Sequence, residues 1–175
     1  MMPTRGFTLI EIVIGIVVLA IALVGLSATL FPQAQRSVDP IYQVRATELG
    51  QSLLTEIVSL SFDQRNNQAG GDNRCSDSPP RVCTDPANLG PEGGESREDY
   101  NDVDDFNGFS TSGDLLTGAT ISELYRNFTV SVSVCYTTSV SGTCTNNITN
   151  YKKVETQVIT PNDLIITFSA YRGNI

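Results

Sequence analysis

The sequence predicts an α+β protein in which a long N-terminal hydrophobic helix packs on a small antiparallel β-sheet with a long acidic loop. Three features of the 175 residues predict this fold. No charged residue occurs from Ile12 to Gln35, a helical stripe of apolar residues follows, and the C-terminal part alternates apolar with polar residues. The acidic segment between the stripe and the alternating part has neither period, so we predict a loop there.

The charge is distributed unevenly along the chain. The chain has 11 basic and 19 acidic residues, which gives a net charge of −8. Residues 63–114 contain 4 of the basic and 12 of the acidic residues, so this segment alone accounts for the whole net charge. There is no basic patch, so we expect no binding to nucleic acid. The chain has no histidine, which excludes Ser/His/Asp and Cys/His catalysis and every histidine-ligated metal site. Composition therefore argues against an enzyme.

The apolar run at residues 7–31 contains one ionisable group, Glu11. A helix of this length rises about 37 Å, which is enough to cross a hydrocarbon core of about 30 Å. Arg5 is the sole charge before the run, which predicts a cytoplasmic N-terminus and a domain on the far side of the membrane. A secretory signal peptide usually has a shorter apolar region, about 7–15 residues. A carboxylate within a membrane costs on the order of 2.5 kcal/mol, so Glu11 is either functional or close to the interface.

The residues at the start of this run, Arg5-Gly6-Phe7-Thr8-Leu9-Ile10-Glu11, resemble the N-terminal signature of type IV prepilins and pseudopilins. This resemblance implies a leader at residues 1–6 that prepilin peptidase removes between Gly6 and Phe7. It also implies N-methylation of Phe7, an assembly helix at residues 7–31, and pairing of Glu11 with the N-terminal amine of a neighbouring subunit. Two buried charges in an apolar fibre offset each other only when they meet.

A looser resemblance concerns the minor pilins of mannose-sensitive haemagglutinin (MSHA) pili. It rests on the opening through Gln33 and on the later Asp102-Val103-Asp104-Asp105-Phe106-Asn107-Gly108. It implies a minor pilin that is anchored in the inner membrane and contacts other pilins through its N-terminal helix. The alternatives are a minor pseudopilin of a type II secretion system and a signal-anchored periplasmic binding module that never polymerises. An exported enzyme has less support, because nothing fixes two acids at a defined separation.

Residues 32–175 are predicted to form the periplasmic globular domain. Pro32 predicts a kink or a local loss of helix between residues 32 and 40, and Asp39-Pro40 is typical of a new helix start. The helix is expected to continue to about residue 62, because apolar residues recur there at helical spacing: Tyr42, Ala46, Leu49, Leu53, Ile57 and Leu60. We expect a loop at 63–114 and a sheet at about 126–172.

Three strands are predicted in the C-terminal part. Residues 128–136 alternate strictly between apolar and polar side chains, and further strands are expected at 151–160 and 164–171. Pro161-Asn162-Asp163 separates the last two as a turn. These short connections favour an antiparallel meander.

The four cysteines are expected to be structural, because the inferred compartment is oxidising. The sequence allows three connectivities. We expect the local pairing, Cys75–Cys83 and Cys135–Cys144, which closes two short loops. No two of the cysteines have CxxC spacing, so neither a zinc site nor a thioredoxin-like motif is indicated.

The acidic segment at residues 92–105 holds seven carboxylates, opposed only by Arg97. Asp102, Asp104 and Asp105 are candidate calcium ligands, because calcium prefers clustered carboxylate oxygens. The spacing does not fit an EF-hand, since aligning Asn107-Gly108 with its glycine places Val103 at the first ligand position. The composition favours a solvated loop with no metal or other cofactor. The interspersed aromatic residues predict that part of the segment is held against the domain.

Overall fold

The computed structural model describes residues 6, 8–36, 39–66, 74–75, 82–113 and 122–175. Two compact units are present, Met1–Ile41 and Tyr42–Ile175. The first contains helix α1 (Leu9–Arg36), and helix α2 (Asp39–Ser59) leads into the second. The chain is helical through Pro32, so this proline does not end α1, and residues 37–38 between the two helices lie outside the described residues.

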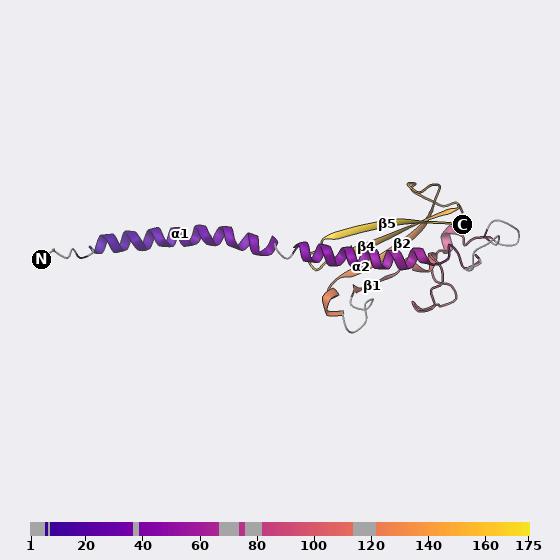
Figure 1. Ribbon diagram of the computed structural model, residues 1–175, viewed down its shortest axis with the longest axis horizontal. Coiled ribbons are helices and arrows are strands. Elements are labelled where there is room, and N and C mark those ends of the chain that lie inside the picture. Colours follow the sequence, from indigo (N-terminus) through magenta and orange to yellow (C-terminus); the bar gives the residue numbers. More distant parts are fainter. Residues whose placement is uncertain (1–5, 7, 37–38, 67–73, 76–81, 114–121) are drawn as a thin grey trace. The chain divides into compact units, whose positions relative to one another are not determined.

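Helix α2 forms the helical layer of the second unit (Figure 1). Its residues Ala46, Leu49, Leu53 and Ile57 are at most 5% exposed and pack in one cluster with valines of the sheet. These are the residues of the predicted stripe, and their burial follows from the 3.6-residue period. The helix ends at Ser59, slightly before the expected residue 62.

The sheet has five antiparallel strands in the order β1-β2-β4-β5, with β3 also paired to β2. The three long strands are β2 (Thr129–Thr137), β4 (Tyr151–Ile159) and β5 (Ile165–Gly173), which confirms the predicted meander and the α+β fold. Two short strands were not predicted, β1 (Ser110–Ser112) and β3 (Cys144–Thr145). Strand β1 lies inside the segment expected to be loop.

Alternation along β2 and β4 determines which side chains reach the core. Val130, Val132 and Val134 are buried on β2, and Val154 and Val158 are buried on β4. Lys152 has the same parity as these valines and is 0% exposed. Side chains two residues apart point to the same face, so β4 carries a lysine into the interior.

A glycine lets α2 approach the sheet closely. A Cβ atom at Gly50 would lie 2.5 Å from ring atoms of Phe168 in β5. Glycine within a helix is less favourable than alanine by about 1 kcal/mol. At this position that loss is offset by closer contact between helix and sheet.

The acidic segment is more ordered and more buried than expected. The 3-10 helix η1 (Pro86–Asn88) precedes it, η2 (Asp104–Phe106) lies at its end, and a further 3-10 helix, η3 (Ser122–Tyr125), precedes β2. Asp102, Val103, Asp104, Asp105 and Phe106 are all 0% exposed. The prediction of a solvated loop is therefore wrong for this part of the segment.

Aromatic packing explains this burial. Tyr100, Phe106 and Phe109 form edge-to-face contacts with centroids 5.0–6.4 Å apart. The guanidinium of Arg97 lies 4.6 Å from the centre of the Phe106 ring and donates to Glu56 of α2 at 2.6 Å. Aromatic burial and these cation–π contacts draw the acidic residues inward with the rings. The prediction that aromatic residues hold the segment to the domain is confirmed.

Candidate functional site

The N-terminal candidate residues lie at the start of α1. Gly6 is exposed, Phe7 lies outside the described residues, and Glu11 is in the first turn of the helix. The backbone N–H of Glu11 donates to the hydroxyl of Thr8 at 3.4 Å and to its carbonyl at 3.1 Å. Thr8 and Glu11 thus have the spacing of a capping box, and an acidic group here also interacts favourably with the helix dipole.

Between Leu9 and Leu26 the surface of α1 is apolar on all sides apart from Glu11. From Leu9 to Leu26 every isoleucine, valine and leucine is 48–81% exposed. The segment Leu9–Ser27 has a mean hydropathy of 3.0, and it is long and apolar enough to cross a membrane. A helix that is hydrophobic all round needs lipid or other protein around it.

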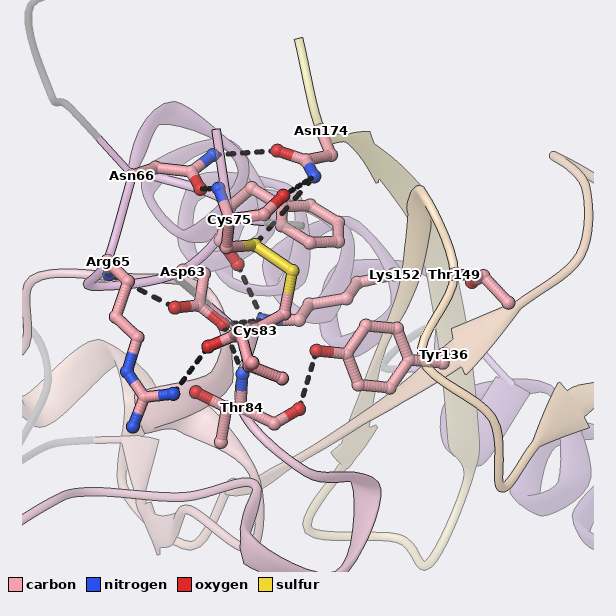
Figure 2. Close-up of a disulfide and its surroundings, with 12 residues drawn as sticks. Asp63, Arg65, Asn66, Cys75, Cys83, Thr84, Tyr136, Thr149, Lys152 and Asn174 are labelled. Carbon is pink, nitrogen blue, oxygen red and sulfur yellow. Dashed lines mark hydrogen bonds and ion pairs between the residues drawn. A yellow bond between two sulfur atoms is a disulfide. The ribbon is translucent and has the colours of Figure 1, made fainter. Parts of the chain in front are cut away.

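Two disulfides are present in the structure. Cys75 pairs with Cys83, and Cys135 of β2 pairs with Cys144 of β3. The first bridge is buried with Phe62 and Tyr136, whereas Cys135 is only partly buried. Asn174 donates to the carbonyl of Cys75 at 3.0 Å and accepts from Asn66 at 2.8 Å, so the first bridge is tied to the end of β5 (Figure 2).

Peptide mapping under non-reducing conditions is expected to recover two cross-linked peptides, one joining Cys75 to Cys83 and the other joining Cys135 to Cys144. Loss of either bridge should lower the free energy of unfolding by about 2–4 kcal/mol. The matched control is the same digest after reduction and alkylation, in which both cross-linked masses disappear. Recovery of a peptide that joins Cys75 to Cys135 would contradict the two local loops.

A buried lysine lies beside the first disulfide. The ammonium of Lys152 donates to the carbonyl of Phe62 at 2.6 Å and to a carboxylate oxygen of Asp104, and it lies 3.7 Å from Asp63. It also lies 4.5 Å from the centre of the Phe62 ring. Figure 2 shows the Lys152 side chain reaching toward Asp63 between the disulfide and Tyr136. All three of these charged side chains are 0% exposed, so the ionic groups are held away from water.

Backbone groups complete the surroundings of this ion pair. Asp63 accepts from the amides of Arg65 at 3.0 Å and Thr84 at 2.7 Å. The Tyr136 hydroxyl donates to the carbonyl of Thr84 at 2.7 Å, and burial raises the pKa of this tyrosine above its ordinary value. Buried charges are tolerated when they are paired and hydrogen-bonded, as Asp63 is here.

Next to the ion pair, five carboxyl groups gather in two overlapping sets. Oxygens of Glu92, Asp102 and Asp104 lie within 4.8 Å of one another, and so do oxygens of Glu92, Glu95 and Asp105. Burial raises the pKa of Glu92 to about 7 and that of Asp102 to about 9, and neighbouring carboxylates add to both shifts. Glu92 and Asp102 therefore resist ionisation unless positive charge is supplied nearby.

The structure brings the three candidate aspartates together and adds residues that the sequence analysis missed. Glu92 and Glu95 come from a turn that precedes the aspartates, and Lys152 and Asp63 come from distant parts of the chain. The one sequence signal for a buried cation was that Lys152 lies an even number of residues from the valines of its predicted strand, and so points to the same face as they do. The N-terminal candidates are in the other compact unit.

Comparison with known proteins identifies one family feature. A model described as the prokaryotic N-terminal methylation motif matches residues 1–27. No curated protein and no solved structure matches the chain. The chain therefore carries a type IV prepilin-like N-terminus, and the methylation motif together with helix α1 indicates membrane anchoring.

Proposed function

We propose that this chain is a minor type IV pilin, a non-enzymatic structural subunit that is anchored in the inner membrane and then packed into a pilus. The observation that carries the proposal is the methylation motif at residues 1–27 running directly into the apolar helix α1. An N-methylation motif implies processing by prepilin peptidase and a pilin assembly context. The globular unit would then be carried on the outside of the fibre.

The exposed apolar surface of α1 is suited both to anchoring in the membrane and to packing in a fibre. In the membrane, lipid covers the side chains from Leu9 to Leu26, and in a fibre the helices of neighbouring pilins replace the lipid. A lone apolar helix satisfies its own backbone hydrogen bonds, so it is stable in either environment. Assembly then exchanges one apolar environment for another.

In this proposal Gly6 and Phe7 form the cleavage site, residues 1–6 are the leader, and Phe7 becomes the methylated N-terminus. Glu11 lies one helical turn beyond it and supplies the carboxylate that meets the Phe7 amine of a neighbouring subunit. An isolated charge in an apolar fibre is strongly unfavourable, so this pair would favour one register between subunits.

Two features support a periplasmic location of the globular unit. Arg5 precedes the apolar segment, so the N-terminus is expected on the cytoplasmic side. Both disulfides of the structure belong to the unit Tyr42–Ile175, and disulfides persist in the oxidising periplasm. The location of the cysteines therefore agrees with the orientation that the charge predicts.

A narrower proposal is the D-type minor pilin of an MSHA pilus. Its support is the resemblance of the opening through Gln33 and of residues 102–108. A minor pseudopilin of a type II secretion system has the same N-terminal chemistry in a different machine. Co-purification with sheared pili supports the pilus, whereas dependence of protein secretion on the chain supports the secretion system. A signal-anchored binding module would do neither.

Mass spectrometry of the mature protein tests the proposal. We expect the chain to begin at Phe7 with one added methyl group on its amine. The matched control is Gly6→Val, which should remain unprocessed at full length. A Cβ at Gly6 meets no atom within 4 Å, so this substitution does not disturb the fold. A mature chain that retains residues 1–6, or one cut after Ser27, would contradict a pilin.

A further inference from the structure

The aspartates of the acidic segment keep oxygen atoms that have no hydrogen-bond partner among the described residues. These buried atoms are Asp102 Oδ2, Asp104 Oδ2 and Asp105 Oδ1. Glu92 Oε2 is likewise buried and has no hydrogen-bond partner among the described residues. The three aspartates are 0% exposed. An unsatisfied buried polar group costs about 1–3 kcal/mol and more when it is charged, so a ligand that contacts these four atoms would stabilise the unit.

The other oxygens of these residues are fully used, and they hold the side chains in place. Asp102 Oδ1 accepts from the amides of Asp104 at 2.8 Å and Asp105 at 3.3 Å. Asp105 Oδ2 accepts from the amides of Asn101 at 2.7 Å and Asp102 at 3.1 Å. Each aspartate is thus held by hydrogen bonds to one oxygen, while its second oxygen has no partner among the described residues.

The nearby cations cannot satisfy these oxygens. Lys152 has three N–H donors, and its neighbours are Phe62, Asp104 Oδ1 and Asp63. Among the described residues, Arg97 forms its ion pair with Glu56. The unpartnered oxygens of Glu92, Asp102 and Asp105 are therefore open to a cation from solution.

We propose that Glu92, Asp102 and Asp104, with Asp105 and Glu95, bind a calcium ion. The donors are all hard carboxylate oxygens, which calcium prefers, and the chain has no histidine and no free cysteine for a softer metal. Two ligands on opposite sides of one calcium ion lie about 4.8 Å apart, because calcium–oxygen distances are 2.3–2.6 Å. Within each of the two sets, Glu92 with Asp102 and Asp104 and Glu92 with Glu95 and Asp105, the oxygens fall within that span.

Calcium at this position would fasten the acidic segment to the domain. Glu92 and Glu95 belong to a turn closed by a hydrogen bond of 3.0 Å, Asp104 begins η2, and Asp104 also pairs with Lys152 of β4. The ion would join the turn to η2 and, through Lys152, to the sheet. This inference does not depend on the proposed function, since it concerns the unit Tyr42–Ile175.

Calorimetric titration of the full-length protein in detergent, first freed of metal with EGTA, tests the site with calcium chloride. We expect about one calcium ion per chain. At a free calcium concentration about 100 times Kd, the midpoint of thermal unfolding should rise by about 5–10 °C. Magnesium should give a smaller rise, because it demands near-octahedral geometry and keeps its water. An equal response to magnesium would overturn the assignment to calcium.

Two substitutions locate the ion. Asp102→Asn keeps the oxygen that accepts from two amides and removes the charge, so calcium affinity should fall at least tenfold. In EGTA the same variant should be as stable as the unaltered protein or more stable, because repulsion is relieved. Glu98→Gln makes the same change of charge at an exposed position of the same segment and should leave calcium affinity unchanged. If Asp102→Asn does not fold, Glu92→Gln, which is partly exposed, decides in its place.

The outcomes divide cleanly. No heat of binding and identical melting in calcium and EGTA would mean that the carboxyl groups share protons, and the site would be rejected. A tenfold loss of affinity in Asp102→Asn together with unchanged binding in Glu98→Gln supports it. Equal loss in both variants would mean diffuse charge attraction, and it would also reject the site.

Discussion

Lys152→Met is expected to lower the free energy of unfolding of the globular unit by about 3–5 kcal/mol, because removal of one partner leaves buried charge uncompensated. Asp104 Oδ1 and the carbonyl of Phe62 lose their donor, and Asp63 loses the nearby positive charge. Methionine is close to lysine in length and fills the same space between Phe62 and Tyr136. The loss therefore reports on the charge rather than on a cavity.

Lys153→Met is the matched control, since it changes the next residue of the same strand. Lys153 points to the other face of β4, is partly exposed, and pairs with Glu155 at 2.6 Å. An exposed pair of this kind contributes about 0–1 kcal/mol. Urea unfolding followed by circular dichroism in EGTA compares the two variants without calcium. Equal midpoints for both would contradict a structural role for the buried ion pair.

The elements that the sequence predicted are those with a local period. The apolar residues from Ala46 to Ile57 recur at helical spacing and predict helix α2. The alternation of apolar and polar residues after Phe128 predicts strand β2. Each of these patterns is complete within one segment, so no distant residue is needed to recognise it. Strands β1 and β3 have three and two residues, which is too short for any period. Both pair with the edge of β2 that β4 does not occupy.

The state of the acidic segment could not be predicted in this way. Its composition is typical of a solvated loop. The burial of its side chains, however, depends on contacts with residues that lie far away in the sequence. Lys152 pairs with Asp104 across 48 residues, and Arg97 pairs with Glu56 across 41. Composition counts charges without showing which of them meet, so it favoured the wrong environment for Asp102, Asp104 and Asp105.

For the N-terminal unit, the sequence is more informative than the structure of the single chain. Its residues are recognised from a short motif, while its structure in isolation is a single helix with exposed apolar side chains. The partner of Glu11 in the proposal is another copy or another pilin, so the decisive contact is absent from any single chain. A substitution that separates a capping role from a pairing role is therefore required.

Glu11→Val is expected to leave membrane insertion and processing intact and to remove most of the protein from sheared pili. Insertion becomes easier, because a charge is taken out of an apolar segment. In the proposed fibre a neighbouring Phe7 amine is left without its partner, and breaking one side of a buried pair costs about 3–5 kcal/mol. That free energy shifts an assembly equilibrium by about two to four orders of magnitude. The measurement is the ratio of this chain in sheared pili to that in whole cells, by immunoblot.

Glu11→Gln separates the two roles of the side chain. Glutamine has the same length and also completes a capping box with Thr8, but it carries no charge to pair with an amine. If Glu11 sets the register between subunits, Glu11→Gln should be lost from pili as fully as Glu11→Val. If Glu11 only caps α1, the glutamine variant should assemble normally. Normal recovery of both variants would count against a register-setting role and favour a place at the tip, where a first-added subunit has no earlier neighbour whose amine it must meet.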